Sequence, residues 1–286
     1  MIDDLVVSSR KERKMKTRLI VAAVTIPLLF VVVVFLHPAV FTSLAAIMCA
    51  IAAYEFIKAA CPKIKLWVKI AVMVCAAAIN FAQLSVHSFA LIRCILVVML
   101  IVLFTEGIRT FSKEDEVPYT EIIGCIFAGF VFPVMLSSLV TLITMENGRL
   151  CLILPFVVTF CCDGGAYFAG MFLGKHRITP VSPKKSVEGY VGGILSGIIC
   201  TLIYGGIVVL VSDVTVNFIT LTVCGVLGSI AVEIGDLAFS LIKRQKGIKD
   251  YGNLLPGHGG ALDRFDSMSF SAPLICALVS IFPVFI

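Results

Sequence analysis

Long apolar segments dominate this sequence and restrict it to a membrane fold. Of its 286 residues, 59% are hydrophobic and only 14% are charged, against about 25% charged residues in ordinary soluble domains. A helix needs about 20 apolar residues to cross a bilayer. Segments of that length recur along the chain, separated by short polar stretches. We therefore predict an all-α, polytopic integral membrane protein.

The segments predict about nine transmembrane helices. Their approximate ranges are 19–36, 39–57, 66–86, 88–104, 122–144, 150–173, 189–211, 216–242 and 268–286. Pro133 predicts a kink in the fifth segment, because proline removes a backbone donor from the helix. No small-residue cleavage site follows the first segment, so we expect it to be retained rather than removed as a signal peptide.

The distribution of basic residues predicts the orientation. If the N-terminus is cytosolic, all of the 23 lysines and arginines except Arg93 and Arg149 fall on the cytosolic side. Such a bias is typical of cytoplasmic loops. It places two polar loops, 174–188 (the basic loop) and 243–266 (the charged loop), on the same face. It also explains the net charge of +5 without nucleic acid, which we do not expect as a partner.

The chain divides by composition into two regions. Residues 1–150 hold five apolar segments and few other features, so we interpret them as a membrane scaffold. Residues 151–286 hold four segments and both polar loops, and we expect the chemistry there. The 11 cysteines lie mostly in apolar stretches without metal-ligand spacing, so we interpret them as small buried apolar residues.

Three carboxylates lie inside predicted membrane helices: Asp163, Glu233 and Asp236. Carboxylates at such depth are costly against lipid and usually line a polar cavity. Glu233 and Asp236 are three residues apart and therefore project from one helical face. Each alone is explained by an ion pair with a basic side chain, but their clustering towards the cytosolic half favours a site. Glu55 is close to the end of its segment, and we expect it to reach the interface.

The charged loop combines both signs. It contains Lys243, Arg244, Lys246, Lys249, Asp250, His258, Asp263, Arg264 and Asp266. Carboxylates of this kind suit Mg²⁺, which takes one or two of them together with water and substrate phosphates. Zinc is disfavoured because His258 has no second histidine or cysteine at ligand spacing. Gly259 and Gly260 would let the backbone approach an anionic ligand closely.

The basic loop carries Ser182, Lys184 and Lys185, and Ser186 is placed to cap the following helix. A basic cytosolic loop is often only a topology determinant. Two such loops beside buried carboxylates indicate more, namely a phosphate-rich substrate bridged by metal.

These residues resemble the signature of the phosphatidate cytidylyltransferases (CDP-diacylglycerol synthases) of bacterial type. The resemblance covers residues 155–267, with Ala261 where the pattern has a larger aliphatic residue. The matching positions are Asp163 to Tyr167, Ser182 to Ser186, Glu188, Gly189, Gly235, Asp236, Ser240, Ile242, Lys243, Arg244, Lys249, Asp250, Pro256, His258, Gly259, Gly260 and Asp263 to Asp266.

The resemblance implies a nucleotidyltransferase of phospholipid biosynthesis in the bacterial inner membrane. It would convert CTP and phosphatidate to CDP-diacylglycerol and diphosphate with Mg²⁺, face the cytoplasm and form a homodimer. By position, the metal ligands would be Asp236 and Asp263, with Glu233 and Asp266 as further candidates. The expected catalytic residues are Asp236, Asp263, Lys243, Arg244, Lys249, His258 and Arg264. The expected substrate-binding residues are Asp163, Ser182, Lys184, Lys185, Ser186, Asp250, Gly259 and Gly260.

Two alternatives stay open. One is another CTP-dependent lipid enzyme, such as a polyprenol kinase. The other is a cation-coupled membrane transporter, in which the buried carboxylates would form an ion path. The transporter is disfavoured because the polar residues gather on one side, whereas transporters often have related halves with a site at the midplane.

Overall fold

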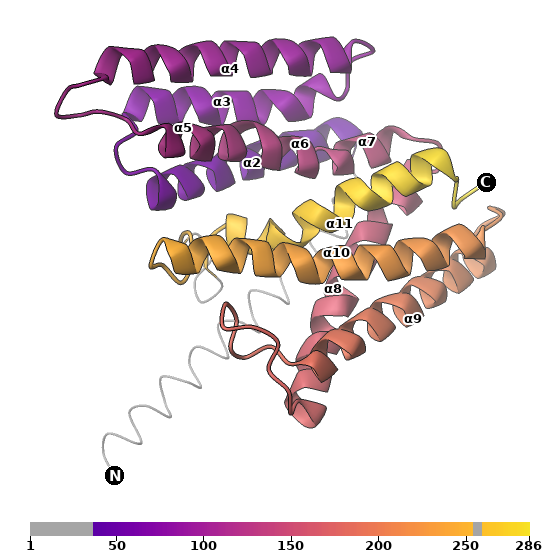
Figure 1. Cartoon of the computed structure of the whole chain (residues 1–286). Coiled ribbons are helices and arrows are strands. Elements are labelled where there is room, and N and C mark those ends of the chain that lie inside the picture. Colours follow the sequence, from indigo (N-terminus) through magenta and orange to yellow (C-terminus); the bar gives the residue numbers. More distant parts are fainter. Residues whose placement is uncertain (1–36, 254–258) are drawn as a thin grey trace, which may run out of the picture.

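The computed structural model describes residues 37–253 and 259–286 (Figure 1). The described chain is helical throughout, apart from two isolated antiparallel bridges. Seven of its helices are long and apolar enough to cross a membrane, and an eighth, Leu66–Ala82, is apolar but shorter. The predicted class of an all-α, multi-pass membrane protein is confirmed. The first predicted segment lies outside the described residues, so the count of nine and the cytosolic N-terminus stay predictions.

The helices follow the apolar segments in order. In the first half they are α2 (Pro38–Ala60), α3 (Leu66–Ala82), α4 (Ser88–Thr110), α5 (Tyr119–Ile126), the π-helical η1 (Phe127–Val131), α6 (Phe132–Leu136) and α7 (Ser138–Thr144). In the second half they are α8 (Gly148–Leu173), α9 (Val187–Val211), α10 (Phe218–Gln245) and α11 (Leu262–Ile281).

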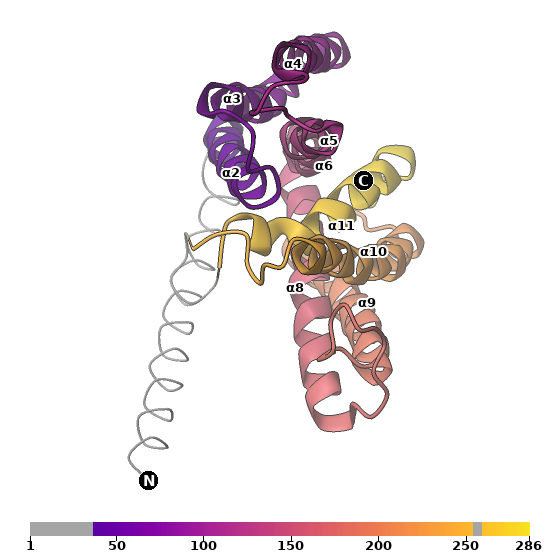
Figure 2. The same cartoon turned by 60° about the vertical axis from the view of Figure 1, so that its left-hand side comes forward.

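The helices form three groups in space (Figures 1 and 2). Helices α2 to α7 lie on one side, the α8–α9 pair lies on the other, and α10 and α11 run between them. Helix α11 contacts α2, α6 and α7 as well as α8 and α10. The helices of the first half therefore form one packed group, and α11 packs against that group.

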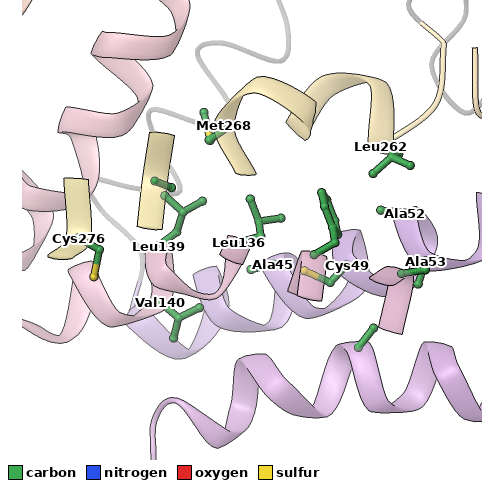
Figure 3. Close-up of a cluster of buried hydrophobic side chains, with 14 of the residues drawn as sticks. Ala45, Cys49, Ala52, Ala53, Leu136, Leu139, Val140, Leu262, Met268 and Cys276 are labelled. Carbon is green, nitrogen blue, oxygen red and sulfur yellow. The ribbon is translucent and has the colours of Figure 1, made fainter. Parts of the chain in front are cut away.

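Small and medium apolar side chains form the interface between this group and α11. Figure 3 shows them: Ala45, Cys49, Ala52 and Ala53 of α2, Leu136, Leu139 and Val140 of α6 and α7, and Leu262, Met268 and Cys276 at α11. Small residues at a helix interface let the backbones approach closely. The row of small residues on α2 therefore allows α11 and the fifth segment to pack tightly beside it.

The fifth segment is interrupted as Pro133 predicts. The π-helical turn η1 directly precedes it, and the helix breaks again at Ser137 between α6 and α7. A proline inside a helix leaves a carbonyl without its usual partner, and the backbone adjusts around it. The interruption of the α-helix near Pro133 is thus observed, and the kink itself stays a prediction.

Several predicted boundaries are wrong because charged residues stay helical. Helix α10 continues past residue 242 to Gln245, so Lys243 and Arg244 belong to its last turn and not to a loop. Helix α4 continues past residue 104 to Thr110, where Glu106 pairs with Arg109 and Lys65. Helix α11 begins at Leu262 instead of 268, so Asp263 and Asp266 belong to its first turns and not to a loop. Acidic side chains are favourable at a helix N-terminus, where backbone N–H groups point outward.

Candidate functional site

A cavity of about 380 Å³ lies between α8, α9, α10 and the basic loop. Three of the predicted carboxylates line it together with three predicted residues of the basic loop. The lining is Asp163, Ala166, Tyr167, Gly170 and Met171 of α8, Lys184, Lys185 and Ser186 of the loop, Gly189 and Tyr190 of α9, and Glu233 and Asp236 of α10. Residues distant in sequence thus meet around one space, as the clustering of acidic and basic residues predicts.

Lys185 is the basic residue that pairs with two of the carboxylates lining this cavity. Its Nζ donates to Glu233 Oε2 over 2.9 Å and also pairs with the carboxylate of Asp236. The ammonium stands 5.2 Å from the centre of the Tyr190 ring. Burial alone would lower the pKa of Lys185, but the carboxylates of Asp236 and Glu233 outweigh it and hold that pKa above its ordinary value. Glu233 and Asp236 therefore do share one helical face, and Lys185 is a charged group.

Hydrogen bonds within the basic loop and to the first turn of α9 fix the conformation of the loop. Ser186 Oγ accepts a hydrogen bond from Gly189 N over 3.2 Å, which confirms it as the cap of α9. The carboxylate of Glu188 accepts hydrogen bonds from the backbone N–H groups of Lys175 and His176. Arg177 and Ser186 form an antiparallel bridge. These contacts turn the loop back on itself and place Lys185 at the cavity.

A second cluster of charged side chains consists of Lys243, Asp263 and Asp266 and joins the two ends of the charged loop. Lys243 Nζ lies 2.9 Å from Asp263 Oδ1 and 3.7 Å from Asp266 Oδ2. Asp263 Oδ2 accepts hydrogen bonds from Tyr251 N at 2.9 Å and Gly260 N at 3.0 Å. Asp263 is buried, and both of its oxygens have protein partners. It therefore fixes the fold of the charged loop, and a metal ion there would have to share it with Lys243.

Helix α10 joins the two clusters, because it carries Asp236, which pairs with Lys185, and Lys243, which pairs with Asp263 and Asp266. No group of three histidine, cysteine, aspartate or glutamate side chains forms a metal cage within the described residues. The donor set nevertheless fits Mg²⁺, which needs only one or two carboxylates when substrate phosphates and water supply the rest. Asp236 and Asp163 both line the cavity; the side chain of Asp236 is 28% exposed and Asp163 is exposed, so both carboxylates are accessible from the cavity.

The other predicted residues occupy different positions. Arg244 Nε donates to the carbonyl of Val181 over 3.3 Å, which ties the end of α10 to the basic loop. Ser182 is half-buried, and Lys249, Asp250 and Arg264 are exposed. Gly259 has a φ of 83°, which suits glycine, and Gly260 is buried. His258 lies outside the described residues.

One buried carboxylate is placed where the sequence does not predict it. Glu55 does not reach an interface; it is 6% exposed, and its Oε2 accepts a hydrogen bond from Leu262 N over 3.0 Å. Its position inside an apolar helix was the only signal of a buried role. Its partner is the backbone N–H group of Leu262, far along the chain. Because nearly every residue type has such a group, the sequence does not reveal this partner.

Comparison with known proteins gives a consistent result. A model described as "Cytidylyltransferase family" matches residues 16–282. A protein of Staphylococcus haemolyticus named phosphatidate cytidylyltransferase is 41% identical over 137 residues, which are 48% of this chain and 51% of the relative. One of the same name from Bacillus subtilis is 34% identical over 187 residues, 65% of this chain and 66% of the relative. The chain thus spans about half the length of the staphylococcal relatives that it matches.

Proposed function

The chain belongs to the cytidylyltransferase family, and we propose that it is a phosphatidate cytidylyltransferase. The reaction joins CTP and phosphatidate to give CDP-diacylglycerol and diphosphate. The cavity supports this proposal most directly, because it brings Asp163, Glu233 and Asp236, from helices of membrane-crossing length, together with Lys184 and Lys185 of the basic loop. Two relatives bear the same activity in their names.

The proposed chemistry is an in-line displacement at phosphorus. A phosphate oxygen of phosphatidate attacks the α-phosphorus of CTP, a new P–O bond forms, and the bond to the β-phosphate breaks to release diphosphate. The attacking oxygen is already anionic at neutral pH, so no strong general base is needed. The obstacle is the repulsion between two polyanions, which cationic groups must neutralise while holding the reactants in line.

The residues of the cavity suit that task. Lys184 and Lys185 supply positive charge where the substrate phosphates would enter. Lys185 has two carboxylate partners, so Glu233 can keep it in place while its contact with Asp236 is exchanged for a phosphate oxygen. Asp236 would hold Mg²⁺, with Asp163 and Asp266 nearby. When bound, Mg²⁺ would neutralise charge on the phosphates of CTP and on the leaving diphosphate.

The surroundings of the cavity suit a lipid substrate. Tyr167 and Met171 of α8 line it, and their side chains are 65% and 54% exposed on the apolar surface of the helix pair. A lipid phosphate could enter from the bilayer while its acyl chains stay among such side chains. The proposal includes a location in the bacterial inner membrane, a site open to the cytoplasm and a homodimer. The distribution of basic residues and the family resemblance support these features.

Labelled CTP tests the proposal. Purified protein in detergent is given phosphatidate, Mg²⁺ and CTP labelled in either the α- or the γ-phosphate, and the lipid fraction is counted. We expect α-label in the lipid only when phosphatidate is present. Transfer of γ-label would indicate a lipid kinase, and label in neither form would overturn an enzymatic role for the cavity.

A further inference from the structure

Helix α11 begins without a cap of its own. Its first residue follows Ala261, which has no side-chain acceptor, so the first N–H groups need partners from elsewhere. Leu262 N donates over 3.0 Å to Oε2 of Glu55, which belongs to α2 in the other half of the chain. A carboxylate at this position also interacts favourably with the positive end of the helix dipole. Glu55 thus caps α11 from outside.

Two glycines of the charged loop, Gly252 and Gly260, lie against this carboxylate. A Cβ atom added to Gly252 would overlap Oε1 of Glu55, and one added to Gly260 would overlap Oε2. Neither glycine has a positive φ, so backbone freedom does not explain them. The absence of a side chain does, because it leaves space for Glu55 between two turns of the loop.

Two further contacts join the same end of α2 to the charged loop. The ring of Phe56 stacks on Tyr251 with 5.7 Å between centroids, and Tyr251 N is one of the donors to Asp263. Lys246 Nζ donates to the carbonyl of Ala60 over 2.8 Å. Helix α2 therefore contacts the described residues on both sides of 254–258, at Lys246, Tyr251 and Leu262.

We infer that Glu55 is a positioning residue for the reaction proposed above, on which this inference rests. It fixes the first turn of α11 and so the directions of Asp263 and Asp266 relative to Asp236 and the cavity. No residue of α2 is among the described residues that line the cavity. Glu55 therefore acts through the groups that it orients and not on the substrate.

A matched carboxylate separates positioning from stability. Glu121 of α5 is also buried and also accepts one backbone hydrogen bond, from Lys63 N over 2.9 Å, but it has no contact of this kind with the charged loop. We compare Glu55→Ala with Glu121→Ala, measuring melting temperature together with kcat and KM for CTP per folded molecule. Both variants should melt earlier. Only Glu55→Ala should lose kcat, by about 10- to 100-fold, as for other residues that orient metal-binding groups.

The conservative variant adds a second criterion. Glu55→Gln keeps an oxygen that can accept the Leu262 N–H, so it should recover a large part of the kcat lost in Glu55→Ala. The inference is overturned if Glu55→Ala has the same kcat as Glu121→Ala, or if Glu55→Gln is no better than Glu55→Ala.

A measurement independent of activity tests the contact itself. Gly252→Ala should lower the melting temperature of the wild type, because the new methyl group meets the Glu55 carboxylate. In a Glu55→Ala background the methyl group has space, so the loss should nearly disappear, which is the non-additivity expected of touching residues. Gly206→Ala, whose Cβ would meet nothing within 4 Å, should have the same effect in both backgrounds. Equal losses from Gly252→Ala in both backgrounds would overturn the inference.

The wild-type assay distinguishes the two proposals. A wild type that does not transfer CMP overturns the proposed function and the positioning role with it. A wild type that transfers CMP, with Glu55 and Glu121 variants of equal kcat, overturns only the positioning role.

Discussion

Replacing Lys185 by methionine should damage stability and activity through two separable causes. The side chain of Lys185 is 22% exposed and that of Glu233 only 2%, so the variant leaves a buried carboxylate without its cation. Removing one partner of a buried pair costs about 3–5 kcal/mol. Because Lys185 is partly solvated, we expect the lower end, about 3 kcal/mol. The free energy of unfolding, followed by SDS titration in mixed micelles, measures this cost.

The double variant Lys185→Met with Glu233→Gln separates the causes. It removes both charges, so most of the lost stability should return. The activity should not return, because the ammonium that faces the substrate phosphates is still missing; one charge-stabilising donor is typically worth about 100-fold or more in kcat. A double variant with normal CMP transfer would show that Lys185 only neutralises Glu233. A single variant as stable as the wild type would refute the buried ion pair.

The remaining predictions concern pH, helix packing and metal. Because the folded-state pKa of Lys185 is raised, its stabilising contribution is complete below the ordinary lysine pKa of about 10.4 and is lost only above it. The difference in unfolding free energy between wild type and Lys185→Met should therefore not shrink between about pH 7 and 9, and a shrinking difference would contradict this. Gly192→Ala should lower the melting temperature far more than Gly206→Ala, because its Cβ would overlap Ala169 Cβ of α8, which cannot rotate away; equal melting temperatures would refute the close approach of α9 to α8. Chelation of divalent cations should abolish CMP transfer, and Mg²⁺ should restore it better than Zn²⁺, because the donors are oxygens; full activity in excess chelator would exclude a metal requirement.

The apolar pattern predicts the helices well because each membrane-crossing helix must satisfy its own backbone. The apolar pattern fails at the ends of the helices, because a charged residue there can belong either to the helix or to the adjoining loop. Glu106 stays in α4 through its pairs with Arg109 and Lys65, and Asp263 stays in α11 through Lys243. A boundary set by such partners depends on side chains that are far away in sequence.

The candidate site divides in the same way. Glu233, Asp236 and Lys185 could be predicted to meet, because charges inside a membrane helix need partners and these three lie towards the same face. Glu55 could not be placed, since its partner is the backbone N–H group of Leu262, and any residue type supplies one. The two fixed oxygens of Asp263 are likewise a consequence of how the loop folds back.

Transfer of α-labelled CTP into lipid by the wild type and by Asp236→Asn tests most directly that the cavity is the site of CMP transfer. Asn keeps the shape of the side chain but removes the charge that faces Lys185 and the cavity. Glu121→Gln, far from these residues in sequence and in its contacts, serves as the control. We predict phosphatidate-dependent labelling by the wild type and the control, and none by Asp236→Asn, although that variant is still inserted in the membrane. Normal labelling by Asp236→Asn would contradict the assignment of the site.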